Sequence, residues 1–300
     1  MNENISVERR ERIDKYLASQ LNLSRSRIQK IITAGKVLLN NSPVRDKSQL
    51  VKPDDSLQVE LPDEIHSNRV RPEDKPLSVL YEDEYLLAVD KPSGIIVHPV
   101  RHPSAGDDLV SGTLVNRLLY HYPELKQVGG SERAGLVHRL DRGTSGVLLV
   151  ARSTEVLLRL QEQFKKRSVR KKYRAICGGR MDEPRIRVEV PLARDPGNPL
   201  LRCADAEGKR AVTTFEKRGE DSTRVALDCK PVTGRTHQIR VHASYIDLPI
   251  IGDNKYAGRA ADRLMLHAQA IEFNHPINNE KVRIKSNSPE VFEQLWQEIV

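Results

Sequence analysis

The segment His138–Gly146, with the sequence HRLDRGTSG, sets one carboxylate among two arginines, two hydroxyls and two glycines. Positive charge on Arg139 and Arg142 favours the ionised form of Asp141 and predicts a lowered pKa for its carboxyl group. Such a group can act as a nucleophile or as a base. The apolar run Val147–Ala151 follows and predicts a buried strand, so we expect Asp141 in a loop that enters the core. An arginine-rich surface loop with a capping aspartate is the competing interpretation of this stretch alone.

A second candidate segment is Thr233–His242, with the sequence TGRTHQIRVH. It predicts a turn followed by the start of a helix, with Thr236 as a possible N-cap. Arg235 and Arg240 are its cationic side chains. Because a buried arginine needs an acidic partner and Asp141 needs a cation to hold it, pairing Arg240 with Asp141 is the simplest hypothesis. Alone, the segment could equally be a phosphate-binding helix N-terminus.

A third segment, Lys165–Arg174, holds seven basic residues, no acidic residue and one tyrosine, Tyr173. Lysines such as Lys171 and Lys172 can contact a phosphate backbone, and an aromatic ring can stack on a base. A basic helix end that interacts with the helix dipole would account for some of these charges, but not for seven. The segment therefore favours nucleic-acid binding, although a tyrosine in a strand can also be half-buried core.

The composition points to a polyanionic partner. The chain of 300 residues has 49 Lys and Arg against 41 Asp and Glu, a formal charge of +8 and a pI of about 9.4. Charge alone does not separate RNA, DNA and an anionic membrane. No stretch approaches the roughly 18 consecutive apolar residues of a spanning helix, and the first residues lack the apolar core of a signal peptide. We therefore expect a soluble, cytoplasmic protein with no membrane partner.

Neither a disulfide framework nor a metal site is expected. Cys177, Cys203 and Cys229 are odd in number, widely spaced and without a CxxC pair. His98 and His102 have helical spacing, but each is followed by a proline, which would disrupt the helix that makes this spacing useful for binding a metal.

Residues 9–62 are predicted to form a small α/β unit. Ile13–Leu21 predicts one helix, and a second should begin after Ser24 as N-cap and end at Gly35. Lys36–Leu39 and Leu57–Leu61 predict two short strands.

The second helix of this unit should bury Ile28 and its neighbouring isoleucines, and it should expose Arg25, Arg27 and Lys30. A solvated charged face is the alternative to an RNA-binding one. The sequence of this unit resembles the small RNA-binding module named after the fourth ribosomal small-subunit protein, which favours RNA.

Residues 63–76 are charged, contain prolines and predict a linker to a larger domain at 77–300. Apolar runs in that domain predict strands at 86–89, 95–97, 147–151, 173–177, 225–229 and 264–273, and helical patterns cover 114–120, 155–164, 238–245 and 290–299. Because strands and helices do not alternate strictly, we expect an α+β domain with a mixed, largely antiparallel sheet and flanking helices. The polar stretch 101–112 is either a loop near bound RNA or a spacer.

Five segments in order resemble the motifs of an RluA-type pseudouridine synthase: VDKPSGIIVHP, HRLDRGTSG, RKKYRAICGG, TGRTHQIRVH and RLMLHAQAIEFNHP. The similarity spans about residues 77 to 285. The additional N-terminal module makes the layout most similar to family members that modify large-subunit ribosomal RNA, although relatives with this layout also modify other RNAs, transfer RNA among the possibilities.

The resemblance implies an isomerase that detaches the uridine base from its sugar, turns it and rejoins it through a ring carbon, without a cofactor. It implies that Asp141 is the essential catalytic residue, whether as nucleophile or as base, and that Arg240 pairs with it. Tyr173 would stack on the target base and can assist proton removal. Arg139 would enter the space that the flipped base leaves.

Leu264 and Leu266 would form an apolar wall opposite Tyr173, although a buried strand explains them equally well. Two other functions compete. A non-catalytic RNA-binding assembly factor would use Asp141 only to hold arginines, and a nuclease would use it with a metal. The nuclease is disfavoured because no second carboxylate lies near Asp141 in the sequence. We take a monomer as the default.

Overall fold

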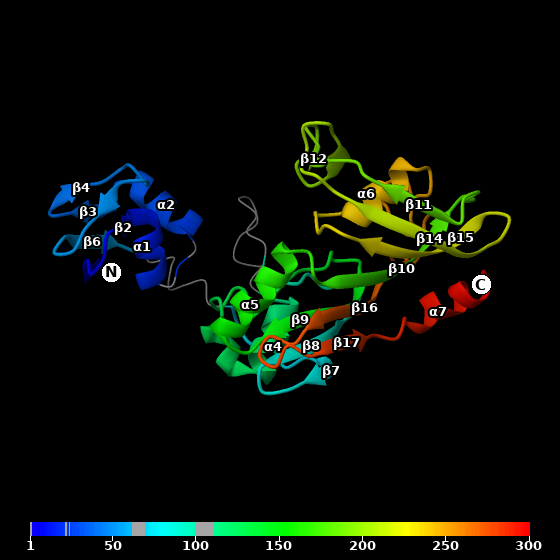
Figure 1. The fold of residues 1–300 in the computed structure, drawn as a ribbon, viewed down its shortest axis with the longest axis horizontal. Helices are drawn as coiled ribbons and strands as arrows, with labels where there is room; N and C mark the ends of the chain where they lie inside the picture. Colours follow the sequence, from blue (N-terminus) through cyan, green and yellow to red (C-terminus); the bar gives the residue numbers. More distant parts are fainter. Residues whose placement is uncertain (1, 22, 24, 62–69, 100–110) are drawn as a thin grey trace. The chain divides into compact units, whose positions relative to one another are not determined.

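The computed structural model describes residues 2–21, 23, 25–61, 70–99 and 111–300. The chain forms two compact units, Met1–Arg69 and Val70–Val300 (Figure 1). Each unit buries a hydrophobic core of its own. The described part of the predicted linker, residues 70–76, lies on the second unit, where Val70 is buried in the core and Asn116 Nδ2 donates to the carbonyl oxygen of Arg71 at 2.7 Å. Residues 62–69 lie outside the described residues.

The first unit packs two helices against a small antiparallel sheet. The helices are α1 (Ile13–Gln20) and α2 (Arg25–Thr33), and the sheet has the order β1 (Asn2–Ser6), β6 (Ser56–Glu60), β3 (Val37–Leu39) and β4 (Ser42–Pro43), beside a separate pair of β2 (Glu11–Arg12) with β5 (Leu50–Val51). Both predicted helices and both predicted strands are confirmed. Strand β1 was not predicted, because its residues NENIS include a single large apolar side chain.

Helix α2 turns its apolar side inward as predicted, with Ile28, Ile31 and Ile32 buried. Lys30 is exposed, and Arg25 is partly exposed while its Nε donates to Asp14 at 2.8 Å. The predicted N-cap Ser24 and the side chain of Arg27 lie outside the described part of the chain.

The second unit is built on a nine-stranded sheet within the residues that the structure describes. Its order is β11 (Arg185–Val188), β14 (Thr213–Glu220), β15 (Arg224–Pro231), β10 (Arg170–Gly178), β16 (Leu266–Asn274), β9 (Ser145–Ala151), β8 (Leu86–Lys91) and β7 (Ser78–Glu82), with β17 (Lys281–Lys285) paired to β16. Among these pairs only β9 with β16 is parallel. The prediction of a mixed, largely antiparallel sheet is confirmed.

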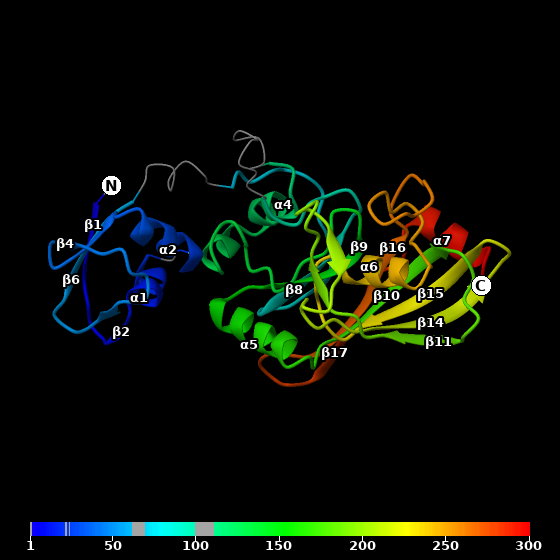
Figure 2. The ribbon, with the colours of Figure 1, turned by 90° about the horizontal axis from the view of Figure 1, so that it is seen from above.

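Helices lie against both ends of this sheet (Figure 2). They are α4 (Leu114–His121), α5 (Thr154–Lys165), α6 (Gln238–Tyr245) and α7 (Glu290–Gln297), with a 3-10 turn at Pro123–Gln127 and a small hairpin of β12 (Leu192–Arg194) with β13 (Arg202–Ala204). Two hydrophobic clusters result: α4 and α5 pack with β8 and β9, and α6 and α7 pack with β10, β14 and β15. Tyr173 contacts both clusters, so it lies where they meet.

The strand predicted at Ile95–Val97 is wrong, because these residues form an irregular segment after β8. Their carbonyl oxygens have other partners. The backbone N–H groups of Leu114 and Val115, at the start of α4, donate to the carbonyl oxygens of Ile96 and Val97 at 2.9 and 3.1 Å. Val97 is buried and Ile95 packs half-buried against the same core, so the apolar character of the segment serves packing and not a strand ladder.

Candidate active site

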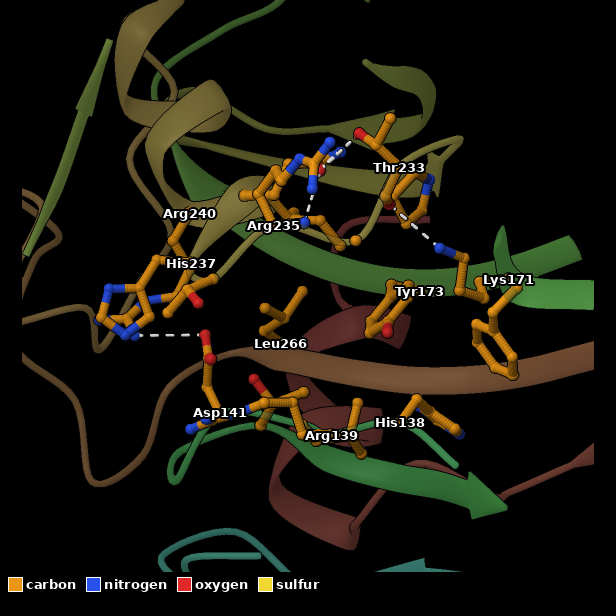
Figure 3. A pocket seen from close by; sticks show the side chains of 18 residues that line it. His138, Arg139, Asp141, Lys171, Tyr173, Thr233, Arg235, His237, Arg240 and Leu266 are labelled. Atoms are coloured by element: carbon orange, nitrogen blue, oxygen red, sulfur yellow. Dashed lines mark hydrogen bonds and ion pairs between the residues drawn. The ribbon is translucent and has the colours of Figure 1, made fainter. Parts of the chain in front are cut away.

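One cavity in the second unit collects most of the candidate residues (Figure 3). Its volume is about 230 Å³. Five parts of the chain line it: the His138–Asp141 loop with Thr144, Phe164 on α5, strand β10 with Lys171 and Tyr173, Pro231 with the Thr233–Arg240 segment, and Leu266 on β16. Figure 3 shows Asp141 with Arg240 on one side of the cavity and Lys171 with Thr233 on the other.

The loop that carries Asp141 is fixed at its exit by β9. The backbone N–H of Thr144 donates to the carbonyl oxygen of Asp141 at 3.1 Å, which closes a turn before the strand starts. Gly146 has φ +112°, and a Cβ atom there would lie 2.3 Å from the carbonyl oxygen of Ala268 on β16. Only glycine therefore lets β9 approach β16 this closely. The approach brings the Asp141 loop next to the strand that supplies Leu266.

A buried lysine holds the other side of this loop. Lys91 is fully buried, and its Nζ donates to the carbonyl oxygens of Pro92 and Ile95 at 2.8 and 2.9 Å. The same Nζ reaches the carbonyl oxygen of Arg142 at 3.2 Å, and the Nε of Arg142 donates to the carbonyl oxygen of Gly94 at 3.0 Å. Burial lowers the pKa of Lys91 to about 7. Arg142, expected to influence Asp141 directly, thus binds the loop after β8.

The contact predicted between Arg240 and Asp141 is present. Arg240 Nη1 lies 3.5 Å from Asp141 Oδ2, at the long limit of a hydrogen bond. The stronger partner of Arg240 is Asp253, which was not predicted from the sequence. Nε and Nη2 of Arg240 donate to the two carboxylate oxygens of Asp253, each at 2.7 Å. Both side chains are buried, so Asp253 fixes the plane of the guanidinium and leaves Nη1 for Asp141.

Helix α6 begins differently from the prediction. Its N-cap is His237, not Thr236, and it has a left-handed backbone conformation with φ +57°. This conformation lets the His237 ring meet Tyr256, whose hydroxyl lies 2.7 Å from His237 Nδ1. The backbone N–H of Arg202 donates to the same hydroxyl at 2.9 Å, so the hydroxyl proton is free to be donated to Nδ1. Burial lowers the pKa of His237 to about 4, and the ring is neutral at pH 7.

Tyr173 and Leu266 supply the apolar surfaces of the cavity from neighbouring strands. Burial and the charge of Asp141 raise the pKa of Tyr173, so its hydroxyl keeps its proton at neutral pH. Leu266 is buried and lines the cavity. Leu264 is buried too, but it packs against Gly143 rather than lining the cavity, so only one of the two predicted leucines contributes to this wall.

The three other basic candidates of this unit lie in different places. Lys171 lines the cavity, and its Nζ donates to the carbonyl oxygen of Thr233 at 3.0 Å, while burial lowers its pKa to about 8. Arg139 is exposed and lines both this cavity and a neighbouring one of about 280 Å³. Lys172 does not line the cavity, because its Nζ pairs with Asp228 Oδ2 at 3.0 Å. The candidates Arg25, Arg27 and Lys30 belong to the first unit.

Across the described ranges, no group of three or more His, Cys, Asp or Glu side chains is arranged to hold a metal ion. In the same part of the chain, no helix combines the length and apolar character that crossing a membrane requires.

Comparison with known proteins gives two family matches. Residues 85–245 match the family model described as RNA pseudouridylate synthase, and residues 11–57 match the S4 domain model. The chain is 37% identical to a Xanthomonas campestris protein named ribosomal large subunit pseudouridine synthase D, over 95% of this chain and 87% of that protein. It is 36% identical to a Bacillus subtilis protein described as an uncharacterized RNA pseudouridine synthase, over 97% of this chain and 95% of that protein.

A solved structure agrees with these matches. The human protein named RNA pseudouridylate synthase domain containing 1 superposes with a TM-score of 0.56 and 28% identity, covering 71% of this chain and 84% of that chain. The pseudouridylate synthase match at residues 85–245 contains Asp141, Tyr173 and Arg240 of the cavity.

Proposed function

This chain belongs to the family of RNA pseudouridylate synthases, isomerases that act on uridine in RNA, and we propose that Asp141 is its essential catalytic residue. One observation carries this proposal. Asp141 is the carboxylate that lines the 230 Å³ cavity, and its side chain contacts a guanidinium nitrogen there at a distance of 3.5 Å. A carboxylate with such a weak contact keeps lone pairs available for substrate. It can attack carbon or accept a proton, and both routes stay open in the proposal.

The surrounding residues take distinct roles in the proposal. Tyr173 stacks on the target base, and Leu266 closes the opposite side of the cavity. The cavity is too small for a duplex, so the uridine must leave its stack to enter, at a cost of a few kcal/mol. Arg139, exposed at the mouth, occupies the space that the base leaves. Arg240 orients Asp141, and Asp253 keeps Arg240 in place.

We propose large-subunit ribosomal RNA as the substrate. The support is the ribosomal name of the Xanthomonas relative, the S4 match and the net charge of +8. Action on ribosomal RNA would take place in the cytoplasm. We also propose that the protein acts as a monomer.

The test is release of tritium from RNA labelled at the uridine ring carbon that forms the new bond. The wild-type protein should release tritium from a large-subunit ribosomal RNA transcript, and Asp141→Asn should release none while it binds the RNA with unchanged affinity. Asp182→Asn, an exposed carboxylate of the same unit, is the matched control and should behave as wild type. Full release by Asp141→Asn would overturn the catalytic role. Release from transfer RNA alone would overturn only the choice of substrate.

We propose that the first unit adds RNA affinity through α2, where Lys30 and Arg25 are at least partly exposed. Removing residues 1–62 should weaken RNA binding and make its dependence on salt shallower, because fewer phosphate contacts release fewer counterions. The catalytic rate at saturating RNA should persist, since the second unit has its own core. An unchanged salt dependence would count against this unit as an RNA contact.

A further inference from the structure

The sheet of the second unit splits between β10 and β15. Their pairing ends at Tyr173 and Cys229. Beyond that pair, Arg170–Lys172 continue on β16 alone, and Lys230 and Pro231 continue on β14 alone. The two strand ends are therefore free to separate. The opening is a crevice of about 460 Å³, which we call the β10–β15 crevice.

Apolar side chains line part of this crevice. Val169, Ala270 and Ile271 are buried in its wall, and Val232 is 39% exposed. Of these four side chains only Val232 is exposed, and it offers a nucleobase an apolar contact beside the end of β15.

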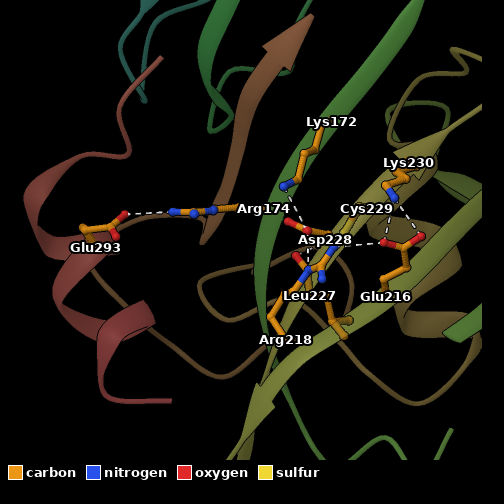
Figure 4. Close-up of polar contacts among 9 residues, drawn as sticks. All are labelled: Lys172, Arg174, Glu216, Arg218, Leu227, Asp228, Cys229, Lys230 and Glu293. Carbon is orange, nitrogen blue, oxygen red and sulfur yellow. Dashed lines mark hydrogen bonds and ion pairs between the residues drawn. The ribbon is translucent and has the colours of Figure 1, made fainter. Parts of the chain in front are cut away.

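The rest of the lining is strongly basic. Six of the lining residues are Lys or Arg, and one, Glu272, is acidic. Two of the lysines are already neutralised: Lys172 pairs with Asp228, and Lys230 pairs with both oxygens of Glu216 at 2.7 Å (Figure 4). Their positions are fixed by these pairs, so little of their charge is left for a ligand.

The arginines are the cations left for a ligand. Arg170 is 79% exposed and contacts Glu272 at 3.5 Å, which is a weak pair. Arg167 and Arg283 are also exposed at the crevice. Arg167 lies just before β10, Arg170 is the first residue of β10 and Arg283 lies on β17, and all three line the crevice together with its apolar side chains. The combination matches a nucleotide, which has a flat base and a charged phosphate.

The crevice adjoins the reaction cavity. Lys171 and Pro231 line both, and the bond from Lys171 Nζ to the Thr233 carbonyl oxygen crosses the gap between β10 and the segment after β15. An RNA strand whose target uridine lies in the cavity can continue directly into the crevice.

We propose that the β10–β15 crevice binds the nucleotide adjoining the target uridine, with its base against Val232 and its phosphate bound by Arg170 and Arg283 in competition with Glu272. The inference rests on the proposed function in that it takes the target uridine to occupy the neighbouring cavity. It adds a second subsite, built by the split of the sheet, to the site that performs the reaction.

Two pairs of variants of the full-length protein test this. Arg170→Ala/Arg283→Ala removes two rim cations, and Arg187→Ala, an exposed arginine on the edge strand β11, is its control. Val232→Glu puts a negative charge in the crevice at an exposed position, and Val232→Gln is its uncharged control of similar size. The probe is a ten-residue oligouridylate, titrated by fluorescence anisotropy between 50 and 200 mM salt.

The double variant should bind the probe several-fold more weakly. The slope of log affinity against log salt should be shallower by about 0.7, because the two arginines are proposed to hold one phosphate of a single strand. Val232→Glu should also weaken binding, and both controls should match wild type. On ribosomal RNA the double variant should raise KM and leave kcat unchanged. Equal affinities and slopes across all five proteins would overturn the proposal.

The outcomes separate the two proposals. A response of oligouridylate binding to the crevice variants supports the subsite even if Asp141→Asn proves active. Loss of activity in Asp141→Asn supports the catalytic role even if the crevice variants bind normally.

Discussion

The two units each contain an aspartate that contacts an arginine, and the two carboxylates are used in opposite ways. Asp14 in the first unit has no exposed side-chain surface and accepts hydrogen bonds from Arg25 at 2.8 Å and Gln29 at 2.7 Å. Arg12 donates to it as well, at 3.2 Å. Asp141 in the second unit has a side chain 17% exposed, and its contact with Arg240 is 3.5 Å long.

The difference shows what makes such a carboxylate reactive. Asp14 of α1 accepts hydrogen bonds from Arg12 of β2 and from Arg25 and Gln29 of α2. It therefore ties α1 to α2, and its lone pairs are taken up by these donors. Asp141 keeps most of its lone pairs facing a cavity because Asp253 occupies the better donors of Arg240. Nearby arginines in a sequence thus do not distinguish a structural carboxylate from a catalytic one. The two kinds of carboxylate are distinguished by the other groups to which the arginines are already bonded.

Of the changes considered, removal of the Arg240 side chain should have the largest effect on the reactivity of Asp141. In Arg240→Ala we expect kcat to fall about a hundredfold, the cost of misplacing a reacting group by about 1 Å, because Asp141 loses the group that orients it. The measurement is single-turnover tritium release at saturating RNA. Arg187→Ala, an exposed arginine on β11 that does not line the cavity, should leave kcat unchanged.

Because Arg240→Ala leaves Asp253 buried without its cation, circular dichroism must first show that the variant is folded. Arg240→Lys keeps the charge but cannot bridge two carboxylates, and it should fall between wild type and Ala. Wild-type kcat in a folded Arg240→Ala would show that the pairing has no role in catalysis.

Asp253→Asn should make Asp141 resemble Asp14. The guanidinium of Arg240 would lose its fixed plane and could close on Asp141, taking lone pairs from the substrate. We expect kcat to fall about tenfold, less than a 1 Å misplacement costs, with KM unchanged. Asp262→Asn, an exposed carboxylate, is the control. An unchanged kcat in Asp253→Asn would rule out Asp253 as a positioning residue.

Much of this arrangement could be predicted from the sequence. Periodicity gave α6 with its bounds and α5 and α7 within two residues, because their apolar faces are regular. The resemblance of the motifs assigned Asp141, Tyr173 and Arg240 to one site, and all three line the same cavity. The prediction for the irregular segment after β8 was wrong for a local reason. Ile95–Val97 is apolar like a strand, but its carbonyl oxygens bond the start of α4 and the Lys91 side chain.

Other features depend on tertiary contacts or on the register of strands, and the sequence reveals neither. Asp253 lies 13 residues after Arg240 in a segment without helical or strand periodicity, so nothing marks it as a partner. Lys171 and Lys172 are adjacent in one basic run on β10, yet Lys171 lines the cavity while Lys172 pairs with Asp228. The crevice exists only because β10 and β15 stop pairing at Tyr173 and Cys229.

Asp14→Asn should affect stability and leave the reaction intact. The amide oxygen can still accept a hydrogen bond, but the charge that Arg25 and Arg12 face is lost. We expect the first unit to lose about 1 kcal/mol of stability, the usual net worth of a hydrogen bond. Hydrogen exchange of α1 and α2 peptides measures it in the full chain, and kcat on saturating RNA should match wild type. Asp54→Asn is the control, because Asp54 is exposed and its left-handed conformation suits asparagine. Equal hydrogen exchange in Asp14→Asn and Asp54→Asn would show that the charge of Asp14 does not stabilise the first unit.

The smallest effect expected is the pH dependence of the difference in stability between wild type and Asp14→Asn. Burial opposes ionisation of Asp14, but the hydrogen bonds from Gln29, Arg25 and Arg12 outweigh it and lower the pKa from 3.8 to about 2. Because the folded pKa lies below the ordinary value, the stabilisation is complete above pH 3.8, declines between 3.8 and about 2, and is absent below that range. The difference in hydrogen-exchange protection between wild type and Asp14→Asn should therefore be constant from pH 7 to about 4 and shrink by pH 2.5. Peptides of the second unit should show no difference between the two proteins at any pH. A difference that stays constant down to pH 2.5 would mean that the charge of Asp14 contributes nothing, and that shape alone holds α1 against α2.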